Sequence, residues 1–144
     1  MGMGDPSVVF DVGAHLGQTT LHFRSKFKNA HIHSFEPVTT NFKKMVQNIG
    51  TRNRISVNEM ALGSTAGKAF IHEGFSDLTH SILSSVNTTK SKAKEEVSVE
   101  TIDTYLARNK IEKIDLLKVD TEGHEMEVLK GADSAIKSGR IEAI

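Results

Sequence analysis

The stretch FDVGAHLG, Phe10 to Gly17, decides the fold of this chain. Two valines precede it, so the pattern predicts a short buried strand that ends near Asp11 and enters a turn with Asp-x-Gly-x-x-x-Gly spacing. Gly13 lacks a β-carbon where the backbone has to turn or approach a ligand, and Gly17 lets the next helix begin close by. Ligands bind at such strand ends in open α/β folds, although a tight turn that serves only the fold would look the same.

The glycine spacing argues against two common phosphate sites. A dinucleotide site needs Gly-x-Gly-x-x-Gly and a P-loop needs Gly-Lys-Ser/Thr, and this turn has neither. Asp11 stands inside the turn, where its charge would repel a pyrophosphate. An acidic residue at this position suits a ligand with an ammonium group and hydroxyls.

The composition is that of one globular domain. The chain has 144 residues, 38% of them hydrophobic, which is enough for a core. Lysine plus arginine (18) equals aspartate plus glutamate (18), so no positive field favours nucleic acid or a membrane as a partner. The absence of cysteine excludes disulfides and thiolate sites, and no signal peptide or membrane span is apparent. We therefore expect a cytoplasmic domain over residues 8–144, after a flexible start or expression remnant at 1–7.

Apolar runs of strand length alternate with segments of helical period. This alternation indicates a doubly wound, Rossmann-like α/β sheet with helices on both faces. The clearest helix begins at Thr39 or Thr40 and ends before Gly50, and its apolar positions are Phe42, Met45, Val46 and Ile49. Further helices are expected around 16–27 and 102–106. Core strands are expected at 8–10, 32–35, 55–62 and 114–119, and added strands at 67–72 and 97–99.

The second half of the chain is less regular. The polar segment from Gly74 to Glu96 has few apolar anchors and is predicted to be a mobile flap. One helix should follow the fourth core strand and end at Gly139, and residues 140–144 should begin a fifth strand. The residues of that helix expected to face inward are Met126, Leu129, Ala132 and Ile136. Because a doubly wound sheet usually has more strands, we expect a C-terminally truncated chain or a minimal core.

The second core strand ends in Phe35-Glu36-Pro37. A carboxylate at this position can accept both hydroxyls of a ribose, a geometry shared by nucleotide and adenosyl ligands. A solvated glutamate before a proline is the plainer alternative. The neighbouring strand end carries Asp11, however, so the sequence predicts that two carboxylates face one crevice.

The stretch DTEGHE, Asp120 to Glu125, follows the fourth core strand and gathers three carboxylates and a histidine. Asp120, Glu122 and His124 have the chemical types of a general base, and crowded carboxylates can raise one another's pKa. The cluster could also hold a divalent metal through oxygen ligands. Acids are favoured in a first helical turn by the helix dipole alone, which is the structural alternative, chiefly for Glu125 and Glu127.

Together these motifs resemble the FkbM family of S-adenosylmethionine-dependent methyltransferases, which have the class I methyltransferase fold. The resemblance covers nearly the whole chain from Val8 to Ile144, and the last motif is the most particular to the family. The motifs are FDVGAHLG, SFEP, ALG at Ala61 to Gly63, VSVETIDTYL and IDLLKVDTEGHEMEVLKGA.

The resemblance implies a role for each matched residue. The turn under the methionine part of the cofactor comprises Asp11, Gly13, Ala14, His15 and Gly17. Glu36, which precedes Pro37 in the second motif, binds the ribose hydroxyls. The adenine slot comprises Met60, Ala61 and Leu62. By the same resemblance, Asp120 lies beside the cofactor and its reacting methyl. Glu122 and His124 join Asp120 as catalytic candidates because of their general-base chemistry.

We therefore expect a methyltransferase that uses S-adenosylmethionine to methylate a hydroxyl of a sugar, a glycan or a polyketide-like small molecule. Oxygen as the acceptor atom follows from the resemblance alone. The resemblance does not require a divalent metal, which is the less favoured mechanism. One alternative is a non-catalytic nucleoside-binding or scaffolding domain of the same fold. A weaker one is an NAD-dependent oxidoreductase, which the missing third glycine disfavours.

Overall fold

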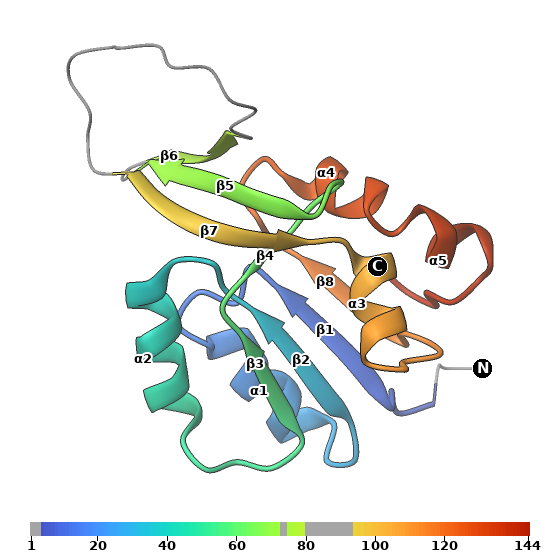
Figure 1. Cartoon of the computed structure of the whole chain (residues 1–144). Coiled ribbons are helices and arrows are strands. Elements are labelled where there is room, and N and C mark those ends of the chain that lie inside the picture. The colour runs from blue at the N-terminus through green and yellow to red at the C-terminus, as the bar shows by residue number, and fades with distance from the viewer. Residues whose placement is uncertain (1–3, 73–74, 80–93) are drawn as a thin grey trace, which may run out of the picture.

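The computed structural model describes residues 4–72, 75–79 and 94–144, and Figure 1 shows their arrangement around two sheets. The first sheet is parallel, with strand order β3-β2-β1-β8. Its strands are β1 (Val8–Val12), β2 (His31–Phe35), β3 (Ile55–Asn58) and β8 (Leu116–Val119). A parallel sheet flanked by helices is an α/β architecture, which confirms the predicted fold class.

The helices pack on both faces of the parallel sheet. They are α1 (Gln18–Lys26), α2 (Thr39–Ile49), α3 (Ile102–Arg108), α4 (Glu125–Lys130) and α5 (Asp133–Lys137). On one face, Val9 of β1 packs with Phe23 of α1. On the other face, Phe10 of β1 packs with Tyr105 of α3, with their rings edge to face. Because β1 is buried on both faces, its sequence is a nearly continuous apolar run, as predicted.

The predicted helix at 39–49 is confirmed as α2. Met45 and Ile49 are buried, and Ala14 of the turn after β1 packs against them. Val46 lies at the edge of this apolar stripe and is 39% exposed. The stripe of α2 therefore supports the turn from below, which fixes the position of the first motif.

The expected single strand at 55–62 is wrong. β3 ends at Asn58, opposite Phe35 of β2, and the chain then crosses to the second sheet, where β4 (Ala61–Leu62) pairs with β7. The two residues between the strands, Glu59 and Met60, form the crossing. Apolar residues recur along 55–62 on both sides of the crossing, so the local pattern does not reveal such a change of partner.

The second sheet has strand order β4-β7-β5-β6 and lies over the carboxyl ends of the first (Figure 1). β5 (Gly67–His72) runs antiparallel to β6 (Phe75–Thr79) and to β7 (Lys94–Glu100), which confirms the added strand at 67–72. The predicted flap at 74–96 thus includes β6 and the start of β7. Its remaining residues, 74 and 80–93, lie outside the described residues.

The expected single helix after β8 is also wrong, since α4 and α5 are two short helices that meet at Gly131 and Ala132. The predicted inward residues Met126 and Ile136 are 65% and 42% exposed. The buried residues of these helices are Val128, Ala132 and Ala135. After the break, the Asp103 carboxylate of α3 accepts from the Ser134 and Ala135 amides and so caps the start of α5. At the break itself, a β-carbon at Gly131 would lie 2.0 Å from the carbonyl oxygen of Gly63, so only glycine fits there.

Residues near both ends of the described chain also pack on the domain. Pro6 is buried, and the Ser7 amide donates to Asp115 Oδ2. Ile141 forms a parallel bridge with Ile114, so residues 140–144 run beside β8 in the direction of the expected fifth strand, although only as a bridge. In the part of the chain that the structure describes, no helix is long and apolar enough to cross a membrane.

Candidate functional site

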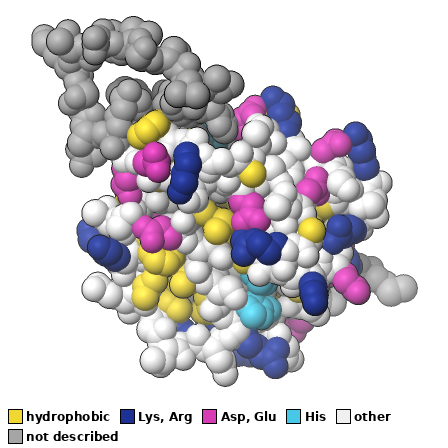
Figure 2. Space-filling model, in the orientation of Figure 1, with side chains coloured by type: hydrophobic (Ala, Val, Ile, Leu, Met, Phe, Trp, Pro, Cys, Tyr) yellow, Lys and Arg dark blue, Asp and Glu magenta, His cyan; other side chains and the backbone are white. Residues whose placement is uncertain are grey.

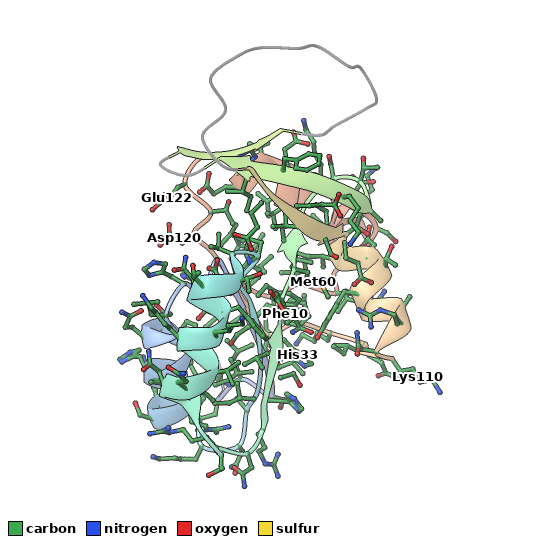
Figure 3. The ribbon with its side chains drawn as sticks, turned by 60° about the vertical axis from the view of Figure 1, so that its left-hand side comes forward. Phe10, His33, Met60, Lys110, Asp120 and Glu122 are labelled. Atoms are coloured by element: carbon green, nitrogen blue, oxygen red, sulfur yellow. The ribbon has the colours of Figure 1, made fainter. Side chains whose placement is uncertain are left out.

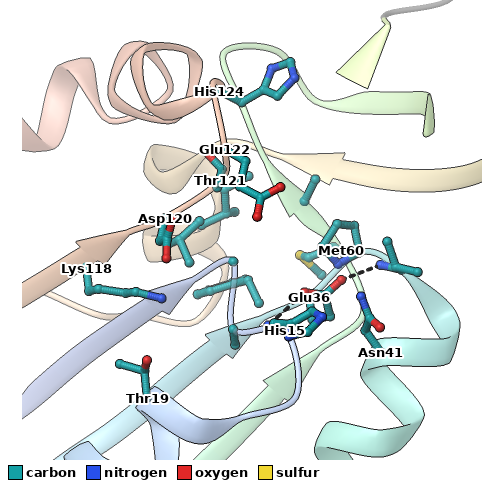
Figure 4. Close-up of a pocket in the computed structure, with 18 of the residues that line it drawn as sticks. His15, Thr19, Glu36, Asn41, Met60, Lys118, Asp120, Thr121, Glu122 and His124 are labelled. Carbon is teal, nitrogen blue, oxygen red and sulfur yellow. Dashed lines mark hydrogen bonds between the residues drawn. The ribbon is translucent and has the colours of Figure 1, made fainter. Parts of the chain in front are cut away.

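A cavity of about 390 Å³ lies at the carboxyl ends of β1, β2 and β8, beneath the second sheet (Figure 4). The described residues that line it include the predicted site residues except Asp11 and Gly17. Figure 3 shows Asp120, Glu122 and Met60 toward this end of the molecule, with Lys110 far from them. The lining of the cavity shows that the tertiary structure brings together the first, second, third and last motifs.

Figure 2 shows acidic and basic side chains interspersed over the face drawn there.

The turn after β1 is held by backbone contacts on two sides. The amides of Gly13 and Ala14 both donate to the carbonyl oxygen of Phe35, at 3.1 and 2.9 Å. Gly13 has φ +79°, and a β-carbon there would lie 2.0 Å from the carbonyl oxygen of Asp120. Gly17, with φ +88°, begins α1 against Met45. Gly13 therefore serves close packing of β1 against β8 and lines the cavity, whereas Gly17 serves the packing of the start of α1 against α2.

Glu36 is the buried carboxylate of the cavity, with 5% of the residue exposed. Its Oε2 accepts from the His15 amide and its Oε1 from the Val38 amide, each at 2.9 Å (Figure 4). A hydrogen bond from the Asn41 side chain also favours its ionised form. Burial raises the pKa of Glu36, and the two backbone bonds oppose that shift. His15 adopts φ +52°, an uncommon conformation that aims its amide at Glu36.

Asp11 occupies a different place from the one expected. Its side chain is fully buried and points away from the lining of the cavity, where Oδ2 accepts from Thr20 Oγ1 at 2.7 Å. Its Oδ1 pairs with Lys118 Nζ at 2.9 Å. Lys118 does line the cavity. Asp11 therefore affects the cavity only through its ion pair with Lys118.

The acid stretch after β8 divides into cavity residues and structural residues. Asp120, Glu122 and His124 line the cavity, and Glu122 has φ +52°. The Glu125 carboxylate instead accepts from the Thr121 and Gly123 amides, and backbone hydrogen bonds, first from its own amide and then from Gly123, lower its pKa. Glu125 thus ties the loop before α4 to the first turn of that helix, where the structural alternative favoured an acid for the helix dipole.

Glu127 is structural as well. Its carboxylate accepts from Ser64 Oγ at 2.6 Å and pairs with Lys130, so it ties α4 to the loop after β4.

Within residues 4–72, 75–79 and 94–144, no group of three or more histidine, aspartate and glutamate side chains is arranged to hold a metal ion.

Among the cavity residues that the sequence analysis did not name, Lys118 and Asn41 are the two with specific contacts to the predicted carboxylates. Lys118 precedes Asp120 by two positions at the end of a strand, and side chains at i and i+2 share one face of a strand. That alternation could have identified Lys118. Asn41 lies one turn into α2, and no local pattern marks it as a partner of Glu36.

Comparison with known proteins gives a consistent result. Residues 11–144 match the family described as "Methyltransferase FkbM domain". The chain is 27% identical over 136 residues to "Hexuronic acid methyltransferase AglP" of Haloferax volcanii, and 27% identical over 148 residues to "Methyltransferase 1" of Beauveria bassiana. These matches cover 93% and 90% of the chain but 53% and 59% of the relatives, so the chain spans little more than half their length.

A solved structure shares the fold. It is the crystal structure of Methyltransferase FkbM from Methylobacillus flagellatus, with a TM-score of 0.65 and 20% sequence identity. The match covers 96% of this chain and 32% of that chain. At this identity the likeness is one of fold.

Proposed function

Because this chain belongs to the family of methyltransferase FkbM domains, we propose that it transfers a methyl group from S-adenosylmethionine to a hydroxyl of a sugar, a glycan or a polyketide-like small molecule. The observation that carries the proposal is the buried Glu36 carboxylate, which shares one cavity with the glycine turn after β1. The Haloferax relative, a hexuronic acid methyltransferase by name, supports a sugar as the acceptor.

The residues of the cavity fit a nucleoside. A volume of about 390 Å³ is within the range of small-molecule sites. A carboxylate offers about four lone-pair sites, and three donors bond to Glu36, so about one site is left for a ribose hydroxyl. The second hydroxyl can bond if the Asn41 side chain turns away. Met60, Leu62 and Ile71 supply an apolar slot for a purine.

The proposed mechanism divides the work between the two ends of the cavity. When bound, the cofactor supplies an electrophilic methyl group on a sulfonium. The turn after β1 and Glu36 hold the donor, while the residues after β8 hold the acceptor hydroxyl in line with the methyl. The proton of that hydroxyl passes to His124 or to one of the carboxylates Asp120 and Glu122, which have the chemical types of a general base.

Calorimetric titration with S-adenosylhomocysteine and with NAD tests the cofactor assignment. We expect S-adenosylhomocysteine to bind and NAD not to bind. Binding of NAD alone would favour the oxidoreductase alternative. Binding of S-adenosylhomocysteine without methyl transfer to a panel of sugars, uronic acids and polyketides would favour the non-catalytic domain.

A further inference from the structure

The cavity contains one charged side chain that the proposed mechanism does not use. Among the described residues that line it, Lys118 is the only lysine or arginine. The others that bear charge or titrate are the carboxylates Glu36, Asp120 and Glu122 and the histidines His15 and His124. Lys118 lies across the cavity from Glu36 and Asn41, with the His15 turn between them (Figure 4).

Asp11 holds the Lys118 ammonium in place. The ion pair measures 2.9 Å, and Asp11 is fully buried while the Lys118 side chain is 24% exposed. Thr20 Oγ1 donates to the other oxygen of Asp11, so this carboxylate is fixed from two directions. An ammonium group has three hydrogens to donate, and Asp11 takes one of them. The group therefore reaches the cavity in a fixed position and with hydrogens still to donate.

We propose that Lys118 binds the α-carboxylate of the amino-acid part of the methyl donor. This inference rests on the proposed function. A donor whose ribose bonds to Glu36 has to extend its amino-acid part along the His15 turn, toward Lys118. Three carboxylates line the same cavity, and they would repel the α-carboxylate. A lysine ammonium opposite it removes that repulsion and forms a charge-assisted hydrogen bond.

The same arrangement assigns Asp11 a positioning role. Asp11 sits in the motif where a direct cofactor contact was expected, but its carboxylate acts through Lys118. A free lysine side chain samples many rotamers, and the buried ion pair restricts it to one position before the ligand arrives.

The test compares two ligands that differ in the amino-acid part. S-adenosylhomocysteine carries the α-carboxylate, whereas 5′-methylthioadenosine keeps the adenine, ribose and sulfur without it. Both are titrated calorimetrically into the wild-type chain and into Lys118→Met, which keeps most of the side-chain length and removes the charge. We expect Lys118→Met to weaken S-adenosylhomocysteine binding by about ten- to hundredfold and to leave 5′-methylthioadenosine binding within about twofold.

Two further variants keep the test decisive. Lys118→Met leaves the buried Asp11 charge unpaired, which can impair folding, so the double variant Asp11→Asn/Lys118→Met removes both charges. The double variant should also bind S-adenosylhomocysteine more weakly than wild type and 5′-methylthioadenosine about equally well. Lys113→Met removes a half-exposed lysine that pairs with Asp115, outside the cavity lining, and should bind both ligands like wild type.

Equal weakening of both ligands in the Lys118 variants, or no weakening of either, would overturn the inference and leave the ion pair a purely structural role. Failure of the wild-type chain to bind either ligand would instead overturn the proposed function. The two failures are thus distinguishable.

Discussion

Gly13 lies directly against the carbonyl oxygen of Asp120, so that a β-carbon on Gly13 would be 2.0 Å from that oxygen. The Asp120 amide in turn donates to the carbonyl oxygen of Val12 at 3.0 Å. The backbones of the first and the last motif are therefore packed and hydrogen-bonded directly against each other, although more than a hundred residues separate them. The Glu36 end and the Asp120 end of the cavity are therefore joined through the backbone of the first motif.

The first prediction concerns that contact. Gly13→Ala should destabilise the domain by about 3 kcal/mol or more, because it combines a strained positive φ with a backbone clash. Gly139→Ala is the matched control, since Gly139 has φ +68° and a β-carbon there would meet no atom within 4 Å. We expect a loss of about 1–2 kcal/mol there. Urea unfolding measures both, and equal losses would contradict the close approach.

The second prediction concerns Glu36. Alanine would leave the His15 and Val38 amides both unpaired, so the informative change is Glu36→Gln, which keeps an acceptor oxygen for one of the two amides and removes the charge. Binding of S-adenosylhomocysteine should weaken by about 1–2 kcal/mol with the fold intact. Glu112→Gln, an exposed residue outside the cavity, is the control. Unchanged affinity in Glu36→Gln would remove this residue from the ligand site.

Glu36 should also impose a pH dependence on binding. Burial raises its pKa above that of an ordinary glutamate, and the ionised form is the better acceptor for a ribose hydroxyl. Affinity for S-adenosylhomocysteine should therefore fall as the pH is lowered through this raised pKa, at a higher pH than for an ordinary glutamate. Calorimetry over a pH series measures the effect, and Glu36→Gln should flatten it.

The fourth prediction concerns the residues after β8. Asp120→Asn and Glu122→Gln should each lower turnover by about a hundredfold if these charges orient the reacting groups. Both residues are exposed, so the free energy of unfolding should change by less than about 0.5 kcal/mol. Asp133→Asn, an exposed acid at the start of α5, should turn over like wild type. Normal turnover in both cavity variants would leave the stretch as a charged start of a helix.

The fifth prediction concerns the buried His33, which is 7% exposed and bonds through Nδ1 to the Tyr105 hydroxyl at 2.9 Å. Burial, and next the nearby His31, lower the pKa of His33 to about 4. The folded chain thus binds this proton less readily than the unfolded chain. The stability that the neutral ring contributes is complete above pH 6.5 and is lost as the pH falls from 6.5 to about 4.

We expect this titration to cost the wild-type chain about 1–3 kcal/mol between about pH 7 and about pH 4.5. His33→Gln keeps a hydrogen-bonding group beside Tyr105 and should lose correspondingly less over the same interval. His22→Gln, on the exposed side of α1, should lose as much as wild type. Urea unfolding at the two pH values decides the point, and equal losses in all three chains would exclude His33 as the cause.

The sequence by itself determined the elements whose signals are local. The apolar run before Asp11 predicted a strand buried on both faces, and the period of 39–49 predicted α2 with its buried Met45. It also placed Glu36 and Asp120 at the same edge of the sheet, because parallel strands present their carboxyl ends at one edge. Strand alternation and helical periodicity are properties of consecutive residues, so one sequence contains them in full.

Only the tertiary structure decided features that depend on a distant partner. Strand 55–62 divides because its two halves pair with different sheets, and the start of α5 is fixed by Asp103 of α3, whose carboxylate accepts from the Ser134 and Ala135 amides. Asp11 pairs with Lys118 and does not face the expected ligand, because a buried carboxylate is stable only beside a cation and a hydrogen-bond donor. Both partners come from distant elements: Lys118 from β8 and Thr20 from α1. These contacts form between segments that are far apart in the chain and become neighbours only through close packing, so no local sequence pattern predicts them.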